Sequence, residues 1–429
     1  MNLATTTTGT GSPKIDAKTR SGGFSFAAPL PLHLAFKEIW RNKGRFFLIA
    51  VVVALITLLV LFTAGLAEGL GLGNREFIEK VNADLVVYSD KSDLLIPASR
   101  ISEGRIRDLR QIDGVQAVGA IAWANVAIVF PDKAAQKVAL GGVLVGQPGE
   151  PVVVDGRQLD FKRGLDAIID KSTAVRTGLK VGDPIQIRSL VGSKEKLYDL
   201  VVAGISGSNQ YGLQPTVFVP HLTWEKIRPR LSDVVSADNK TPSVTSVTFN
   251  VAFVRLNNPT DQVAMTKAIE QGIADTKSIL RETDGVRVVD KKTAYENTPG
   301  YGPQQSTLGL QRVFTLLIGL LVVGSFFRIQ ALQKIAQVGV LKAIGTANWK
   351  IALAALVQIF VVNAFGVVLG ALLTWGLTFG IPPVVPVRFD GADVARTVAL
   401  LLIIGPLGGL SSVQVLLKAE PLKALGLAS

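Results

Sequence analysis

The stretch Phe46–Leu66, FFLIAVVVALITLLVLFTAGL, decides the fold, because it runs for 21 residues without a charged side chain. An α-helix needs about 20 such residues to span the hydrocarbon core of a bilayer. Three more apolar stretches follow, and four buried core helices of this length would be unusual in 429 residues. The last stretch holds Pro406 and Gly408-Gly409, which neighbouring helices must accommodate. We therefore predict an integral membrane protein with four transmembrane α-helices, placed at 46–68, 306–328, 351–377 and 397–417.

The rest of the composition excludes several kinds of chemistry. The chain has no Cys and only two His, His33 and His221. It therefore lacks thiolate metal sites and a cysteine nucleophile, and it has few ways to form a Ser-His-Asp triad. We expect His221 to be a loop or helix-start residue rather than a ligand. No GxxxxGK[ST], HExxH or GxSxG motif is present, so we predict that the chain is not an enzyme and that it holds no cofactor of its own.

The net charge of +12 is concentrated in three short segments. Residues 1–45 carry +5, residues 328–350 carry +4 and residues 418–429 carry +1, whereas the long segment 69–305 carries only +2. Short basic segments beside membrane spans stay on the cytoplasmic side. Both termini are therefore predicted to be cytoplasmic, and 69–305 is predicted to lie outside. Charge distributed in this way reports membrane topology and does not indicate a nucleic-acid partner.

The segments that flank the spans follow from the same topology. Residues 1–30 are polar and of low complexity, which predicts a disordered cytoplasmic tail. Residues 31–45 have apolar side chains at helical spacing, which fits an amphipathic helix on the inner leaflet with Trp40 as interfacial anchor. A plain charged flank explains 31–45 equally well. The remaining segments are predicted as a cytoplasmic loop at 329–350, a short outer loop at 378–396 and a cytoplasmic tail at 418–429.

Segment 69–305 is predicted to be a large extracytoplasmic α+β domain between the first and second spans. Alternating or continuous apolar runs predict its strands, and Ser102 is expected to be the N-cap of its first helix. The predicted strands lie at 83–89, 119–130, 138–145, 185–188, 197–205, 216–219, 244–256 and 286–289, and the predicted helices at 102–112 and 259–283.

Two short stretches carry a resemblance to a known family. Gln337–Thr346, QVGVLKAIGT, resembles a segment of MacB/FtsX-type ABC transporter permeases, and Glu420–Leu425, EPLKAL, resembles the end of their chains. The resemblance implies that the loop after the second span docks into a cytoplasmic ATPase, which binds the ATP, and that two permeases pair as a homodimer. Gln337 stands where the family often has an acid, so no carboxylate role is carried over. The coupling residues implied are Gln337, Val338, Gly339, Val340, Leu341, Lys342, Ala343, Ile344 and Gly345.

The spacing within this loop gives the resemblance a physical basis. Val338, Leu341 and Ile344 lie three residues apart, which predicts a short helix with an apolar knob. Gly345 can end that helix. The alternative is a simple interfacial loop without a partner.

The first part of the chain resembles one particular branch of this family. Leu34–Ile39, Gly65–Leu70, Asn74-Arg75 and Ala83-Asp84 are similar to the HrtB/DevC branch of the family. HrtB-type permeases export haem and DevC-type permeases belong to glycolipid-exporting systems. The resemblance therefore implies a bacterial cell-membrane protein with an amphiphilic or hydrophobic cargo, with haem as one candidate.

Four residues are candidates for cargo binding. Glu68 is the acid at the outer end of the first span, where it could bind a cation or ligate haem iron, or be solvated among the headgroups. Arg312, near the outer end of the second span, could pair with Glu68 or with a cargo carboxylate. Tyr88 and Tyr211 could ligate haem through oxygen.

Three functions are compatible with these observations. The first is export, in which motion of the ATPases passes through the loop 329–350 and the spans to the outside domain. The second is an FtsX-like regulator that activates a cell-wall hydrolase through its outside domain. The third, a membrane-anchored enzyme, is disfavoured by the missing Cys and scarce His.

Overall fold

The structure, a computed structural model, describes residues 40–160, 163–230, 248–275, 285–382 and 385–418. The predicted tail at 1–30 lies outside the described residues. So do most of the interfacial helix predicted at 31–45 and nearly all of the C-terminal tail, including the stretch Glu420–Leu425.

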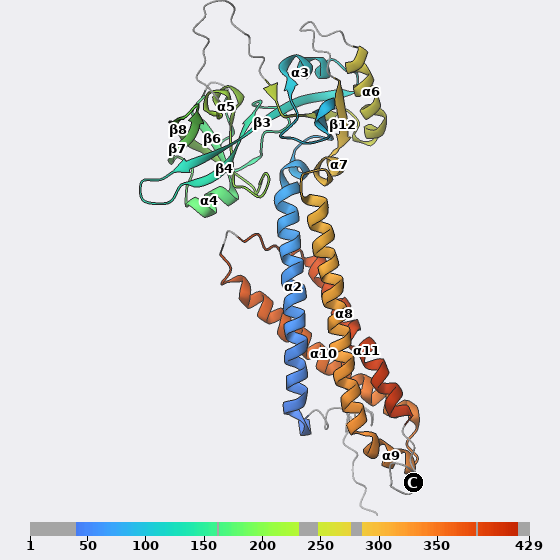
Figure 1. Cartoon of the computed structure of the whole chain (residues 1–429). Coiled ribbons are helices and arrows are strands. Elements are labelled where there is room, and N and C mark those ends of the chain that lie inside the picture. Colours follow the sequence, from blue (N-terminus) through green and yellow to red (C-terminus); the bar gives the residue numbers. More distant parts are fainter. Residues whose placement is uncertain (1–39, 161–162, 231–247, 276–284, 383–384, 419–429) are drawn as a thin grey trace, which may run out of the picture.

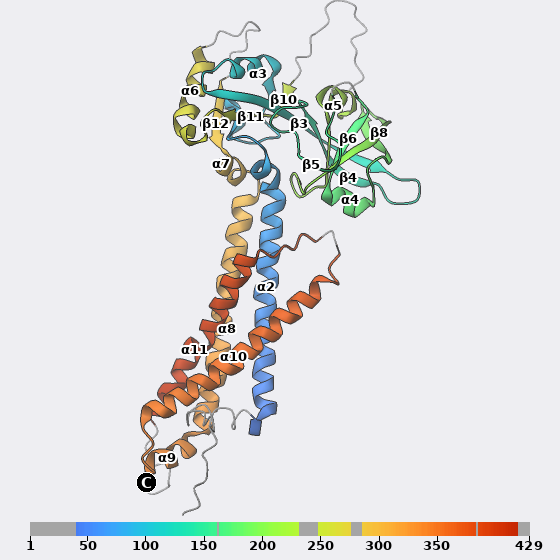
Figure 2. The same ribbon diagram turned by 180° about the vertical axis from the view of Figure 1, so that it is seen from behind.

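Four helices of the described chain are long and apolar enough to cross a membrane, which confirms the predicted number of spans. They pack side by side as a bundle below the α+β domain (Figures 1 and 2). The bounds are α2 Lys43–Lys80, α8 Tyr301–Gln333, α10 Asn348–Thr378 and α11 Gly391–Leu417.

The helices α2 and α8 are longer than a membrane span. At 1.5 Å per residue, the 38 residues of α2 extend about 57 Å, against a hydrocarbon core of about 30 Å. Both helices run as unbroken rods up to the α+β domain, side by side in both views (Figures 1 and 2). The helix that contains the first span therefore continues beyond residue 68 and enters the domain.

The proline in α11 is accommodated by its neighbour α10. Pro406 has no N–H, so the carbonyl of Leu402 lacks its usual helical donor. The buried side chain of Asn363 donates to the carbonyls of Leu401 and Leu402, at 3.0 and 3.3 Å. Gly405 leaves room for Asn363, because a Cβ at Gly405 would lie 2.3 Å from its Cγ. This agrees with the sequence-based expectation for Pro406.

The α+β domain is built on a ten-stranded mixed sheet within the described residues, in the order β12-β1-β11-β3-β4-β9-β6-β8-β5, with β7 pairing β3 and β8. A separate pair joins β2 and β10. The strands are β1 Leu85–Ser89, β2 Ile101–Ser102, β3 Val115–Val129, β4 Gln136–Val143, β5 Val153–Gly156, β6 Asp166–Asp170, β7 Pro184–Val191, β8 Lys194–Ser206, β9 Thr216–Pro220, β10 Thr248–Phe249, β11 Val251–Leu256 and β12 Val286–Asp290.

The shorter helices cover and connect this sheet, and they are α3 Glu103–Arg110, α4 Lys171–Thr177, α5 His221–Ile227, α6 Gln262–Asp275 and α7 Lys291–Glu296. The N-cap prediction is confirmed, since Ser102 Oγ accepts from Arg105 N at 3.2 Å. His221 is the first residue of α5, as expected.

Side chains of β1 alternate between two cores, as the pleat of a strand requires. Leu85 and Val87 face the core that contains α3 and α6. Val86 and Tyr88 face a second core that includes Phe77, Ile78 and Val81, at the end of α2. The top of the first membrane helix is therefore part of the domain's hydrophobic core.

Two predicted elements differ from the structure. Of the strand predicted at 244–256, residues 244–247 lie outside the described chain, and the rest is divided at Asn250, whose side chain accepts from Trp123 N and donates to the carbonyl of Ile96. The helix predicted from Pro259 starts at Gln262, because Pro259–Asp261 forms a 3-10 turn, and residues 276–283 lie outside the described chain. The strands β2, β5 and β6 and the helices α4, α5 and α7 were not predicted.

Candidate functional site

At the inner end of the bundle, the chain forms a short helix, α9 Ile335–Ala343. It follows α8 after a one-residue break at Lys334 and turns away from it (Figures 1 and 2). Gly345 has φ +92° and donates to Lys342 O, while Thr346 donates to Leu341 O. These two bonds form a Schellman motif. The geometry agrees with the expectation that Gly345 ends this helix.

The predicted apolar knob has a different composition in the structure. Val338 is only 6% exposed and packs with Ala331, Ile351 and Leu416, because this face of α9 rests on the ends of the other helices. Gly339 is buried beside it. The exposed apolar side chains are instead Val340, Leu341 and Ile344, at 41%, 37% and 78%. We call these three residues the coupling surface; Gln337 and Ala343 are also exposed.

Polar contacts join the region around α9 to the other three spans. Lys342 Nζ donates to the carbonyl of Leu417, at the end of α11, at 2.6 Å. Lys334 Nζ donates to Gln358 of α10 at 3.1 Å and lies 5.8 Å from the ring centre of Phe46 in α2. A force on α9 would therefore reach every span and not only α8.

At the outer end of the bundle, three charged residues follow one another along one face of α2. Arg75 pairs with Glu68 at 2.7 Å and with Glu79 at 3.3 Å. The predicted pair of Glu68 with Arg312 is absent from the described ion pairs, and Arg312 instead donates to Thr397 of α11. Arg75 can reach Glu68 because it lies on the same face of the helix, two turns further along.

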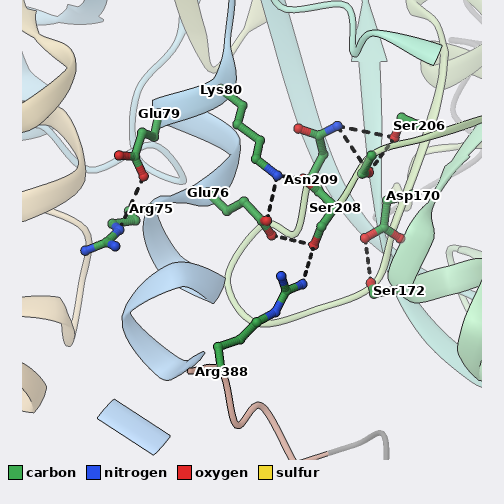
Figure 3. A network of polar contacts seen from close by, with 11 residues as sticks. Arg75, Glu76, Glu79, Lys80, Asp170, Ser172, Ser206, Ser208, Asn209 and Arg388 are labelled. Carbon is green, nitrogen blue, oxygen red and sulfur yellow. Dashed lines mark hydrogen bonds and ion pairs between the residues drawn. The ribbon is translucent and has the colours of Figure 1, made fainter. Parts of the chain in front are cut away.

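A second face of α2 contacts the α+β domain through a polar network (Figure 3). The carboxylate of Glu76, a residue only 4% exposed, accepts from Lys80 Nζ at 2.8 Å and from Ser208 Oγ at 2.6 Å. Lys80 Nζ also donates to Ser208 O at 2.7 Å, and Arg388 donates to Ser208 Oγ at 3.3 Å. We call Glu76, Lys80, Ser208 and Arg388 the junction network; it joins the span, the domain and the loop between α10 and α11.

Glycines on this face of α2 let two loops reach the helix backbone. A Cβ at Gly69 would lie 1.6 Å from Pro386 O, and Arg388 N donates to Gly65 O at 2.9 Å. One turn further, Leu213 N donates to Gly73 O at 3.1 Å. The spacing Gly65-x-x-x-Gly69 therefore receives the outer loop of the same chain.

The end of α2 is also capped from the far side of the domain. Lys291 Nζ, at the start of α7, donates to the carbonyls of Glu79 and Val81. Lysine side chains near a helix C-terminus satisfy carbonyls that have no helical donor. Since α7 leads directly into α8, the outer ends of the two long helices are fixed to one another through the domain.

The structure does not bring the two candidate tyrosines near Glu68 and Arg312. Tyr88 is fully buried in the apolar core, and Tyr211 stacks on Trp123 with ring centres 4.1 Å apart. Burial raises the pKa of both phenols. Neither side chain is presented to a cargo in this conformation.

The structure also shows how far Trp40 and His221, two residues singled out from the sequence, are exposed. Trp40, the predicted interfacial anchor, is 82% exposed. His221 is buried against Phe249 and Trp224, with ring centres at 4.1 and 5.5 Å, and burial lowers its pKa to about 4.

Sequence reasoning missed the junction network. A signal was available for Glu76 and Lys80, whose i, i+4 spacing favours an ion pair on a helix. Ser208 and Arg388 come from loops 132 and 312 residues away from Glu76 along the chain, and no local pattern marks them.

Four spans, an α+β domain between the first two and a short helix after the second are the features of a membrane permease. The family model for the MacB-like periplasmic core domain matches residues 46–272, and that for the FtsX-like permease C-terminal matches residues 312–421. The chain belongs to the MacB/FtsX-type family of ABC transporter permeases.

Proteins that are similar to nearly the whole chain are also described as permeases. It is 25% identical over 397 residues to the putative hemin transport system permease protein HrtB of Staphylococcus haemolyticus, covering 92% of this chain and 99% of that protein. It is 22% identical, over the same shares, to an uncharacterized ABC transporter permease of Mycobacterium tuberculosis.

Solved structures of outside domains are also similar. One is the extracellular domain of the transporter YknZ from Gram-positive bacteria, with 16% identity, a TM-score of 0.33, and coverage of 48% of this chain and 100% of that one. Another is the periplasmic region of MacB from Actinobacillus actinomycetemcomitans, with 12% identity, a TM-score of 0.34, and coverage of 53% and 99%.

Proposed function

We propose that this permease relays ATP-driven motion of a separate cytoplasmic ATPase to its outside domain, and thereby expels an amphiphilic or hydrophobic cargo. One observation carries the proposal: α2 is a single helix that starts beside Lys334, next to α9, and ends inside the domain core. The contacts described above fix it at both ends, to the α8–α9 junction and to the junction network.

The relay has three steps in this scheme. Closure of the ATPases pushes on the coupling surface, Val340, Leu341 and Ile344. Because Lys334, directly before α9, bonds to α10, and Lys342 of α9 bonds to the end of α11, the push moves the inner ends of the spans together. The rigid rods α2 and α8 then carry the displacement to the domain, whose core contains Phe77 and Ile78 of α2 and Val81 directly after it.

The scheme includes a homodimer with two-fold symmetry, its inner side facing two ATPase subunits and both termini in the cytoplasm. Closed two-fold symmetry is the commonest arrangement of homo-oligomers. Two permeases would then move their outside domains relative to each other. The basic segments at 1–45 and 328–350 support this orientation through the positive-inside rule.

Haem is the first cargo to test, because the names of the HrtB relatives point to hemin. Glu68 lies at the outer end of the span with a carboxylate side chain 22% exposed, and Arg75 holds it in place. A titration of haem into the purified chain, followed at the Soret band, should show a shift that Glu68→Gln reduces and Glu79→Gln preserves. Equal shifts in both variants would remove Glu68 from the proposal without removing export.

Coupling is tested with the reconstituted complex of permease and ATPase. The double variant Leu341→Asp/Ile344→Asp should lower cargo-stimulated ATP hydrolysis to the unstimulated rate, because charge is placed on the coupling surface. Val263→Asp is the matched control, since Val263 is 79% exposed on α6 of the outside domain and Ile344 is 78% exposed. A cell-separation defect on gene deletion, without haem sensitivity, would instead favour hydrolase regulation.

A further inference from the structure

A cavity of about 550 Å³ lies between the α+β domain and the loop that joins α10 to α11. Both ribbon views place α4 on the side of the domain that faces this loop (Figures 1 and 2). Three parts of the chain meet there: α2 with Gly69, Gly73 and Glu76, α4 with its neighbouring loop, and the outer loop itself. The contacts of Gly65 and Gly69 with the outer loop fix one wall of the cavity against α2.

The lining of the cavity is positively charged. It contains Lys171 and Arg176 of α4 and Arg388 of the outer loop. Neither Lys171 nor Arg176 forms an ion pair with another described residue. Glu76 is the acid among the described lining residues, and its carboxylate is already engaged by Lys80 and Ser208. Free cationic groups therefore face an open space without a described counter-ion.

The membrane-side wall of the same cavity is apolar. Trp375 and Ile381, from the outer end of α10 and the residues after it, line it together with Val385 and Phe389. Trp375 is 64% exposed, and its ring meets that of Phe379 edge to face at 5.0 Å. Tryptophan at the end of a membrane helix sits at the level of the lipid headgroups. The cavity thus has the two cations of α4 on its domain side, and on its membrane side mostly apolar side chains beside Arg388.

We propose that this cavity binds the anionic headgroup, phosphate or carboxylate, of an amphiphile in the outer leaflet. Lys171, Arg176 and Arg388 pair with the headgroup, and the apolar part lies against Trp375 and Phe389. The inference rests on the proposed function and deepens it, because it gives a class of ligand and an entry point beside the helix bundle. An occupant would also contact the junction network directly through Arg388.

The test measures lipid binding to the purified full chain without any ATPase, so its failure is distinct from a failure of coupling. Native mass spectrometry in detergent compares phosphatidylglycerol, which is anionic, with phosphatidylcholine. We expect retention of phosphatidylglycerol, weakened about tenfold or more in Lys171→Gln/Arg176→Gln/Arg388→Gln, because the cations that would form charge-assisted hydrogen bonds with the headgroup are removed. The control Arg107→Gln/Lys226→Gln/Lys267→Gln removes the same charge from α3, α5 and α6, and should bind like the parent chain.

Three results would overturn the proposal: equal retention of both lipids, unchanged binding in the cavity variant, or an equal loss in the control variant. Inorganic phosphate and dihexanoyl phosphatidylglycerol identify the source of the ligand. Displacement by inorganic phosphate alone would indicate a soluble anion and contradict a lipid site, whereas displacement only by the short-chain lipid supports it. If the triple variant does not fold, Arg176→Gln alone is measured, because Arg176 has no described side-chain partner, and unchanged binding there contradicts the proposal.

Discussion

The hydroxyl of Ser208 lies 2.6 Å from the carboxylate of Glu76, and this contact joins a loop of the outside domain to a membrane-spanning helix. Both residues are less than 9% exposed. Because Lys80 bonds to both partners, the contact is part of a closed polar triangle at the point where α2 enters the domain. Motion of α2 along its axis cannot leave this part of the domain behind without breaking these bonds.

The first prediction concerns the strength of this connection. Glu76→Ala should destabilise the chain by about 1–3 kcal/mol, because Ser208 and Lys80 lose a buried acceptor. The control Glu79→Ala removes a carboxylate that is 53% exposed and should cost less than about 1 kcal/mol. The midpoint of thermal unfolding in detergent measures both, and equal midpoints would show that Glu76 is not a structural link.

The second prediction concerns the contact between the outer loop and α2. Gly69→Ala places a methyl group where Pro386 O now lies, and backbone atoms cannot rotate away as a side chain can. The outer loop should therefore lift from α2 and become more accessible. Hydrogen exchange at Val387 and Arg388 measures this, since Arg388 N now donates to Gly65 O. Gly302→Ala, which has open space around it, should leave the exchange unchanged.

The third prediction concerns the proline in α11. Asn363→Ala should destabilise the bundle by about 1 kcal/mol, the order of magnitude of hydrogen bonds between membrane helices. In a Pro406→Ala background the loss should be smaller, because the new N–H can donate to Leu402 O. Unfolding midpoints of the four chains in one detergent form the cycle. If the effects of the two substitutions on the unfolding midpoint simply added, Asn363 would not compensate for the N–H that Pro406 lacks.

The fourth prediction concerns His221. The pKa of its imidazole is lowered to about 4 by burial, whereas in the unfolded chain it is about 6.5. The unfolded state therefore binds the proton first, and stability falls as the pH is lowered from about 6.5 to about 4, by at most about 3 kcal/mol. His221→Phe should show a smaller drop in unfolding midpoint between pH 7 and pH 4.5. An identical drop in both chains would contradict this.

Much of the fold could be predicted from the sequence, because membrane spans and long strands carry strong local signals. The length of the apolar stretches and the asymmetric distribution of charge predict the four helices. The alternation of apolar and polar residues predicts strands such as β3 and β11. The short strand β6 was missed since Asp166–Asp170 offers only three apolar residues between two acids. Its burial is decided by β8 and β9, which pair with it from distant parts of the chain.

The candidate site was predictable only in part for the same reason. Helical spacing marks Val338, Leu341 and Ile344 equally, but which of them faces outward depends on how α9 rests on Ile351 and Leu416. The position of Glu68 at the end of a span likewise suggests a cationic partner such as Arg312, but it does not reveal that Arg75 is the partner. Contacts between remote segments, such as Glu76 with Ser208, leave no trace in a single sequence.

The most direct test of the relay measures whether the outside domain moves when the coupling surface is pushed. The chain has no Cys, so Lys226→Cys on α5 provides one spin-label site per permease, and pulsed electron resonance reports the distance between the two labels of the proposed homodimer. The complex with the partner ATPase is placed in nanodiscs, and ATP is bound under conditions that prevent its hydrolysis. The distance between the labels should then change in the parent chain and in Val263→Asp. It should not change in Leu341→Asp/Ile344→Asp. A distance that does not respond to ATP, or one that shifts equally in the coupling-surface variant, would contradict the account.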